Sequence, residues 1–183
     1  FTRTIMGSRV IANGEKAFTE DNVLFADSAF FRIFSFELQK GDPKQCLDAP
    51  DKIVLTKTMT KKYFGNEEAL GKTLRLGNSK DYIISGIVSE IPDNSQIKFD
   101  FVIPFINLSA AKQEEQWFTA NYVTYLLLKE GSQRENLQKQ ISQYLDEVSQ
   151  KELFTDGSGY LTHHLEPLTS VHLYSTLDGL EPN

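Results

Sequence analysis

The first third of the chain alternates β-forming runs with short helical patterns. A strand is predicted over residues 3–12, where β-branched and apolar residues gather, and it ends at the Asn13-Gly14 turn. Residues 16–18 and 22–25 continue the pattern as a return pair. The chain is therefore expected to begin with an antiparallel hairpin.

Two short helices are predicted next. Asp27 or Ser28 is expected to cap the first, because a side-chain oxygen there can accept a backbone N–H that the helix leaves unpaired. Thr56 opens the second after a β-branched strand at residues 53–55, and Gly65 ends it. The first helix is too short to be stable alone, so it must bury its aromatic rings.

The middle of the chain has the pattern of a small β structure. Residues 73–76 and 81–88 predict two strands joined by a Gly-Asn-Ser-Lys turn. Residues 98–102 alternate polar and apolar side chains, as a half-buried strand should. Because turn residues separate these strands, we expect a β-rich lobe here.

Towards the C-terminus the sequence again shows both strand and helix patterns. An apolar strand is predicted over residues 122–128, and a helix follows it to about Ser149. Ser132 and Glu135 have the spacing of a capping box, in which each side chain bonds the other residue's backbone N–H. Residues 160–165 predict a final strand.

This order of elements predicts an α+β protein with a discontinuous main lobe. We expect residues 1–65 and 119–175 to form one α+β lobe, with residues 66–118 inserted into it as a small β-rich lobe. Inserting a lobe into a surface loop has only a small entropic cost of loop closure, which makes this arrangement feasible. Residues 176–183 are expected to be a tail outside both lobes.

Charge and cysteine content narrow the function classes. The net charge is -6, from 19 Lys and Arg against 25 Asp and Glu, and no basic cluster exceeds the pair Lys61-Lys62. The sequence therefore lacks the cluster of Lys and Arg that typically binds nucleic acid, and we expect no nucleic-acid partner. A single cysteine, Cys46, supports neither an internal disulfide nor a structural zinc site.

Few residues suggest catalysis. His163 and His164 are neighbours in a predicted strand and should point to opposite faces, so surface positions are favoured over a shared metal. His172 lies close enough in sequence to leave a metal site open. Cys46 has neither a helix start nor a nearby histidine, which favours a plain loop residue over a nucleophile. We predict no catalytic residue, no metal ligand and no cofactor.

Aromatic residues offer two further hypotheses. The run at residues 30–36 could line an apolar pocket, although core packing is favoured. Trp117 and Phe118 follow the polar run at residues 112–116, and aromatics flanked by polar residues are a candidate partner contact.

An ordered series of short motifs resembles a known family. The chain is similar to the periplasmic core domain of MacB/FtsX-type ABC-transporter permeases, especially the branch common in Bacteroidetes. Each motif is weak by itself, but together they span nearly the whole chain in the family's order. The matching stretches are residues 26–36, 40–43, 53–56, 61–65, 70–74, 86–88, 91–95, 99–101, 165–168 and 171–173.

The resemblance implies a porter-like α+β lobe with a smaller β-rich lobe inserted, placed between the first and second transmembrane helices of a permease. It also implies that the tail at residues 176–183 leads to a membrane helix outside the chain. It implies a location at the periplasmic face of the bacterial inner membrane, with no catalytic residues. The implied partners are the protein's own transmembrane helices, a cytoplasmic ATPase subunit, a second copy of the permease domain, and a periplasmic adaptor or substrate. The expected role is to couple ATP hydrolysis to conformational change outside the membrane.

Two other functions stay open at this point. The aromatic content and the two-lobe layout also suit an extracytoplasmic ligand-binding or sensor domain of a membrane signalling protein. A metal-dependent hydrolase using His163, His164 or His172 is the third candidate. The motif series favours the permease over both.

Overall fold

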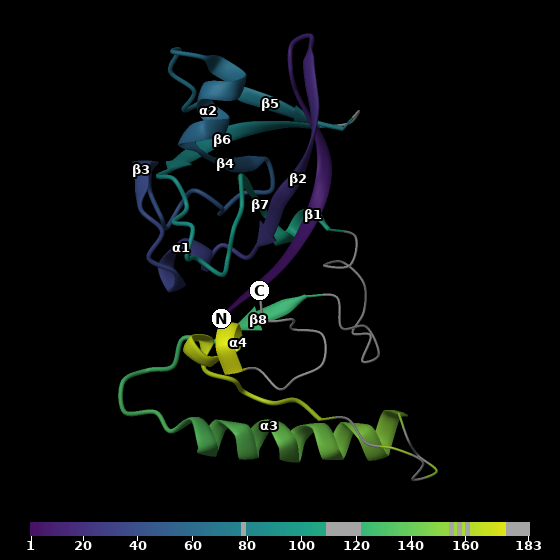
Figure 1. Cartoon of the computed structure of the whole chain (residues 1–183). Helices are drawn as coiled ribbons and strands as arrows, with labels where there is room; N and C mark the ends of the chain where they lie inside the picture. The colour runs from purple at the N-terminus through teal and green to yellow at the C-terminus, as the bar shows by residue number, and fades with distance from the viewer. Residues whose placement is uncertain (78–79, 109–121, 154–155, 157–158, 160–161, 175–183) are drawn as a thin grey trace. The chain divides into compact units, whose positions relative to one another are not determined.

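The computed structural model describes residues 1–77, 80–108, 122–153, 156, 159 and 162–174 (Figure 1). The chain divides into two compact units, residues 1–127 and residues 128–183. The first unit contains the sheet, and the second is helical in its described part. None of the helices in the described residues has the length and apolar character that a membrane span requires.

The first unit is built mainly from strands that belong to one eight-stranded sheet. Its elements, in chain order, are β1 (Thr2–Asn13), β2 (Lys16–Ala26), α1 (Phe30–Ile33), β3 (Leu38–Gly41), β4 (Lys52–Thr56), α2 (Lys57–Phe64), β5 (Thr73–Leu76), β6 (Lys80–Val88), β7 (Phe101–Pro104), η1 (Phe105–Asn107) and β8 (Val123–Tyr125).

The sheet curls back on itself. Its strand order is β2-β7-β4-β6-β5-β1-β8, with β3 paired to β6 off this path. β1 also pairs with β2 along most of its length, so β1, β2, β7, β4, β6 and β5 form a closed circuit. The β2–β7 and β4–β6 pairs are parallel, and the other pairs are antiparallel. Figure 1 shows β1 and β2 as a long twisted hairpin.

Buried side chains gather on two sides of this sheet, because successive residues of a strand point to opposite faces. One cluster, here called the α2 side, packs strand residues such as Ile53, Leu55 and Phe101 against Tyr63 and Phe64 of α2. The other, here called the α1 side, has a different membership. It contains Leu24, Ala26, Phe30, Phe31, Cys46, Leu47, Val54, Val88, Phe99 and Val102, with Phe34, Phe36, Leu38, Ile91 and Ile97 packed against it.

Several local predictions are confirmed. The backbone N–H of Met59 donates to the Thr56 hydroxyl at 3.4 Å, so Thr56 caps α2 as expected. Gly65 ends that helix with a φ of 64°, which glycine adopts without the steric penalty of a Cβ. β5 has the predicted bounds, and the predicted α+β class is confirmed as well.

The predicted cap of α1 is wrong. The helix begins after Ala29, and no side chain caps its first turn. The Asp27 carboxylate instead accepts hydrogen bonds from Arg3, which lies far away in sequence but close to it in the sheet. A charge-assisted pair with a guanidinium is stronger than a bond to a neutral backbone N–H, so the carboxylate turns to the strand.

The predicted half-buried strand near residue 100 is also wrong in one respect. All four residues of β7 are buried, Val102 as fully as Phe101 and Ile103. β7 lies between β2 and β4, and the two clusters cover its two faces. A central strand covered on both faces loses the polar alternation of an edge strand.

The β-rich stretch of residues 66–118 was expected to be a separate lobe. Its described strands pair with strands from residues 1–65: β5 with β1, β6 with β4, and β7 with β2. The division between compact units falls instead between Leu127 and Leu128. Local turn signals predicted β5 and β6 to within one residue, but they carry no information about which strands these pair with.

The second unit contains α3 (Arg134–Val148), the π-helical turn η3 (Ser149–Leu153) and α4 (Leu168–Tyr174). The predicted helix is confirmed, but its capping box is wrong: Gln133 occupies the cap position, and its side chain makes no capping hydrogen bond. The predicted strand at residues 160–165 is absent from its described part, residues 162–165. The Gln138 side chain holds that segment instead, donating to the carbonyl of His163 at 2.7 Å and accepting from the N–H of Leu165 at 2.6 Å.

Candidate functional site

A bidentate ion pair ties the beginning of β1 to the end of β2. Arg3 donates from Nε and Nη2 to the two oxygens of Asp27, at 3.0 and 2.9 Å, and its backbone N–H donates to the same carboxylate at 2.8 Å. The hydrogen bond with Asp27 raises the pKa of the Arg3 guanidinium, so the pair stays charged. The guanidinium also lies 4.3 Å from the centre of the Phe105 ring. The first residues of the sheet are therefore held by several directional contacts.

A second polar link joins the hairpin to α2. Glu20 of β2 has only 7% of its side chain exposed, and it accepts from Lys62 at 2.7 and 3.0 Å and from the Tyr63 hydroxyl at 2.5 Å. Burial, together with the hydrogen bond to Glu20, raises the pKa of Tyr63 above its ordinary range. Lys62 lies over the Phe18 ring, 4.7 Å from its centre. A buried carboxylate has to be paired inside the protein, and Lys62 and Tyr63 supply that pairing for Glu20.

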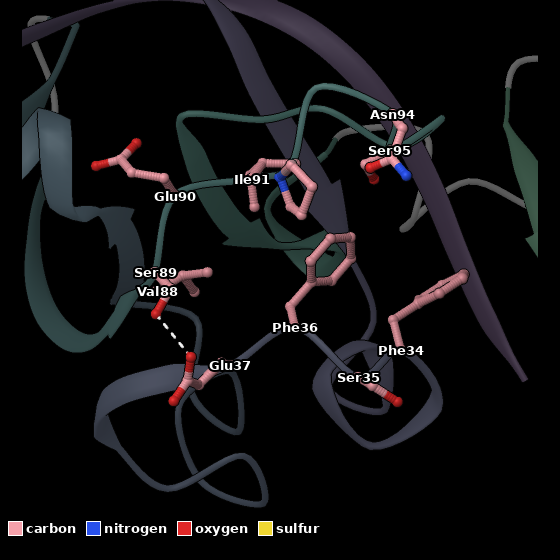
Figure 2. Close-up of a pocket in the computed structure, with 11 residues that line it drawn as sticks. Phe34, Ser35, Phe36, Glu37, Val88, Ser89, Glu90, Ile91, Asn94 and Ser95 are labelled. Atoms are coloured by element: carbon pink, nitrogen blue, oxygen red, sulfur yellow. Dashed lines mark hydrogen bonds between the residues drawn. The ribbon is translucent and has the colours of Figure 1, made fainter.

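The α1 side contains a half-open hollow of about 390 Å³ (Figure 2). Two chain segments line it: residues 34–37, which follow α1, and residues 88–95, which begin at the end of β6. The β3–β6 ladder fixes their spacing, and the Ser89 N–H donates to the Glu37 carbonyl at 2.9 Å. The volume falls within the range of known ligand pockets.

Aromatic rings form the apolar wall of the hollow. Phe36 stacks on the fully buried Phe30 with ring centres 5.6 Å apart and meets Phe99 edge-on at 5.1 Å. Phe34 contacts Phe36 at 6.0 Å and Tyr125 of β8 at 5.0 Å. Phe34 and Phe36 are each half-buried, so parts of both rings remain accessible from the hollow. Figure 2 shows the Phe36 ring directed towards the turn that carries Ile91.

Two carboxylates stand at the rim. Glu37 accepts from the Ser89 hydroxyl at 3.1 Å, and Glu90 accepts from the Thr58 hydroxyl at 2.7 Å. Within the described part of the chain, neither belongs to an ion pair. The hollow therefore has an aromatic wall, while both carboxylates are directed away from the Phe36 ring (Figure 2).

The structure places the remaining predicted candidates as follows. Trp117 and Phe118 lie outside the described residues. His163 and His164 are both exposed, in a segment without regular secondary structure, and His172 belongs to α4. Among the described residues, no three His, Cys, Asp or Glu side chains gather as a metal site would require.

Cys46 is a core residue of the α1 side with 1% of its surface exposed. Burial raises the pKa of its thiol from 9.0 to about 11, which opposes formation of the nucleophilic thiolate. The Cys46 carbonyl accepts from the Ser85 hydroxyl at 2.6 Å, so the residue is fixed beneath the sheet.

Sequence reasoning missed both polar links and the hollow. One signal for the second link was available, namely the charged residue Glu20 within the polar interruption between residues 18 and 22 of an otherwise apolar strand. The hollow had a weaker signal in the aromatic run at residues 30–36, where core packing was favoured over a pocket. The structure has both: Phe30 and Phe31 are core residues, while Phe34 and Phe36 line the hollow.

The curled sheet with α1 and α2 is a fold that two solved domains share. A domain of a protein described as a permease, from Porphyromonas gingivalis, superposes with a TM-score of 0.71 and 22% identity, over 93% of this chain and 77% of that one. The periplasmic region of MacB from Actinobacillus actinomycetemcomitans gives a TM-score of 0.56 and 19% identity, over 82% of this chain and 68% of that one. At these identities the likeness establishes the fold.

The family follows from the sequence itself. The chain belongs to the MacB-like periplasmic core domain family, whose model matches residues 2–144. This confirms the family that the ordered motifs predicted. No curated protein matches the chain.

Proposed function

We propose that this chain is the non-catalytic extracytoplasmic domain of an ABC-transporter permease, which couples ATP hydrolysis in the cytoplasm to conformational change on the periplasmic side of a bacterial inner membrane. The observation that carries the proposal is the family match over residues 2–144. That match favours a permease over the sensor-domain and hydrolase alternatives.

The structure supports this proposal through the way β1 enters the sheet. A membrane helix that precedes β1 would pull on residues 1–3, and Arg3 is fixed to Asp27 by three hydrogen bonds. β1 pairs with β2, β5 and β8, so a displacement of its first residues is shared with three other strands. Closely packed interiors transmit such displacements with little compression.

The proposed partners follow from the same role. They are the protein's own transmembrane helices, a cytoplasmic ATPase subunit, a second copy of the permease domain, and a periplasmic adaptor or substrate. Trp117 and Phe118 stay a predicted partner contact.

The test uses the complete permease with its ATPase subunit, reconstituted in lipid nanodiscs. In a Cys46→Ala background, a spin label is placed at Glu15→Cys in the exposed β1–β2 turn of each copy, and the distance between the two labels is measured with and without ATP and vanadate. A nucleotide-dependent change in that distance is expected. If the complex hydrolyses ATP but the distance between the labels is the same with and without nucleotide, the coupling role is ruled out.

A variant pair tests the entry of β1. Arg3→Gln should reduce the nucleotide-dependent distance change, because it removes the ion pair at the start of the sheet. Arg75→Gln is the matched control, since it removes an exposed ion pair with Asp81 on the β5–β6 hairpin. If both variants respond alike, the Arg3–Asp27 pair has no special part in transmission.

A further inference from the structure

β8 is a short and weakly attached edge of the sheet. It contains three residues and stands at the end of the strand order, where it pairs with the first residues of β1 (Figure 1). None of its three residues is fully buried, and Val123 is 42% exposed, whereas all four residues of β7 are buried. The free energy of local opening follows the amount of buried apolar contact, so β8 belongs to the least stable part of the sheet.

Two aromatic contacts, one on each side of the sheet, hold the segment that contains β8. The Tyr125 ring meets Phe34 of the α1 side edge-on, with ring centres 5.0 Å apart. Tyr122, directly before β8, meets Phe105 of the α2 side edge-on at 5.3 Å. One aromatic pair changes an equilibrium by about tenfold at most, so these contacts position β8 but do not fix it permanently.

The start of β1 has a second attachment that does not depend on β8. The N–H of Arg3 donates to the Asp27 carboxylate at 2.8 Å, and the carbonyl of Arg3 accepts from the N–H of Asp27 at 3.2 Å. Both backbone groups of Arg3 therefore face the end of β2. The bidentate ion pair with Asp27 strengthens this attachment.

β8 is bonded through the neighbouring residues of β1. Because the backbone of Arg3 faces Asp27, the hydrogen-bonded pairs with β8 are those on either side of it, formed by Thr2 and Thr4. Both threonines are buried. Their separation from β8 would expose hydroxyl and backbone groups that water can bond, so the net cost of opening is modest.

The chain passes from β8 almost directly into the second unit, since only residues 126 and 127 separate Tyr125 from Leu128. We propose that β8 is a releasable strand: it separates from β1 while the rest of the sheet stays folded, and this lets the second unit move without distorting the sheet. Arg3 keeps the start of β1 in the sheet during the opening. The inference deepens the proposed function, and rests on it only for the force that moves the second unit.

The test is hydrogen exchange of the ¹⁵N-labelled 183-residue chain, followed by NMR at several urea concentrations below the unfolding midpoint. The amides of Thr4, Val123 and Tyr125 should exchange through one shared opening, about 100-fold or more faster than the amides of β7. The Arg3 amide should exchange about tenfold or more slowly than that of Thr4, because its carboxylate partner stays in place. The shared opening should depend weakly on urea, since little surface is exposed.

Two variants separate release of β8 from a general loss of stability. Tyr125→Ala removes the contact with Phe34 and should speed exchange in β8 about tenfold. Ile53→Val is the control, because Ile53 is buried in β4 and stays buried when β8 opens. It should speed exchange in β7 about fivefold and leave exchange in β8 unchanged.

A distance measurement tests movement of the second unit. In a Cys46→Ala background, spin labels are placed at Glu15→Cys in the β1–β2 turn and at Lys139→Cys on α3, both exposed positions. Tyr125→Ala should broaden the distribution of distances between the labels, because β8 is released more often. Ile53→Val should leave the distribution unchanged.

Specific results would overturn the proposal. β8 amides that exchange only together with those of β7 would show that the strand is not released separately. An Arg3 amide that exchanges as fast as that of Thr4 would show that β1 leaves with β8. A distance distribution that Tyr125→Ala leaves unchanged, or that both variants broaden alike, would reject the role in movement. These measurements need no membrane or nucleotide, so their failure leaves the distance change between permease copies unaffected, and the reverse holds.

Discussion

The two sides of the sheet treat polar groups differently. On the α2 side, Glu20 is buried and receives hydrogen bonds from Lys62 and Tyr63, so its charge is fully compensated inside the protein. On the α1 side, Glu37 and Glu90 stand at the rim of a hollow and are bonded only by hydroxyls. The carboxylate on the α2 side of the sheet is thus buried and paired, whereas those on the α1 side are exposed.

This difference separates the parts of the domain that maintain its shape from those able to meet a partner. A buried carboxylate must be paired inside the protein, because leaving it unpaired would carry a large desolvation penalty. An exposed carboxylate is solvated and can exchange water for a ligand at little loss. Substitution of the carboxylate on the α2 side is therefore expected to lower stability more than substitution of the carboxylates at the rim of the α1 side.

The largest effect on stability is expected inside the α1 side, at Phe30. This ring is fully buried, and the rings of Phe31, Phe34, Phe36 and Phe99 lie between 5.1 and 5.8 Å from it. Phe30→Ala should lower the free energy of unfolding by about 3–5 kcal/mol, as for other buried aromatic residues. Urea unfolding followed by circular dichroism measures this loss.

Phe36→Ala is the matched control, because Phe36 belongs to the same cluster but is half-buried at the hollow. Its loss should be about half as large, on the order of 2 kcal/mol. Equal losses for the two variants would mean that the hollow is as closed as the core, which contradicts the comparison.

A backbone substitution should affect the α1 side almost as strongly. Gly41 ends β3 with a φ of 97°, and a Cβ there would lie 2.5 Å from the carbonyl oxygen of Ser85. Gly41→Ala should therefore destabilise by about 2 kcal/mol or more and displace β3 from β6. Gly14→Ala is the control, since Gly14 also has positive φ, 60°, but no atom within 4 Å of its added Cβ. The control should lose only about 1 kcal/mol; a reversed order in chemical denaturation would show that crowding by β6 is unimportant.

The α2 side can be tested at the Tyr63 hydroxyl. Tyr63→Phe leaves the ring in place but removes a donor from the buried Glu20, so a loss of about 1–2 kcal/mol is expected. In the double variant with Glu20→Gln, the two losses should not add, because both belong to one network. Strict additivity in a double-mutant cycle would show that the two side chains act independently.

The elements that sequence predicted well are those whose cause is local. Thr56 caps the helix that it begins, and Gly65 supplies the positive φ that ends it. The failures share a different cause. The sequence does not show that Arg3 lies beside Asp27, so Asp27 was mistaken for a helix cap. It also does not show that β2 and β4 flank β7, so β7 was not recognised as a central strand.

The candidate site was harder to predict than the fold. The aromatic run at residues 30–36 supports both a core and a pocket, and the sequence does not show where one ends. α1 contains only four residues, so Phe34 and Phe36 follow its end and lie along the edge of the cluster. The opposite wall, residues 88–95, comes from a turn more than fifty positions away. The β3–β6 ladder and the hydrogen bonds from Ser89 to Glu37 bring the two segments together.

The smallest effect on stability is expected at Cys46. This residue also tests whether solvent reaches the core of the α1 side through the hollow. Cys46→Ala should destabilise by no more than about 1 kcal/mol, because little buried volume is removed. The thiol pKa is raised from 9.0 to about 11, so its contribution is complete below pH 9 and is lost as the pH rises through 11. The stability of the unmodified chain should therefore fall relative to that of Cys46→Ala between these pH values.

A disulfide reagent checks directly whether Cys46 is accessible, since the chain has one cysteine. At pH 8 the raised pKa alone makes the native thiolate about 100-fold scarcer than in the unfolded chain, and burial should slow labelling further. Native labelling as fast as unfolded labelling would mean that the hollow reaches Cys46, and the contrast between a sealed core and an open rim would then fail.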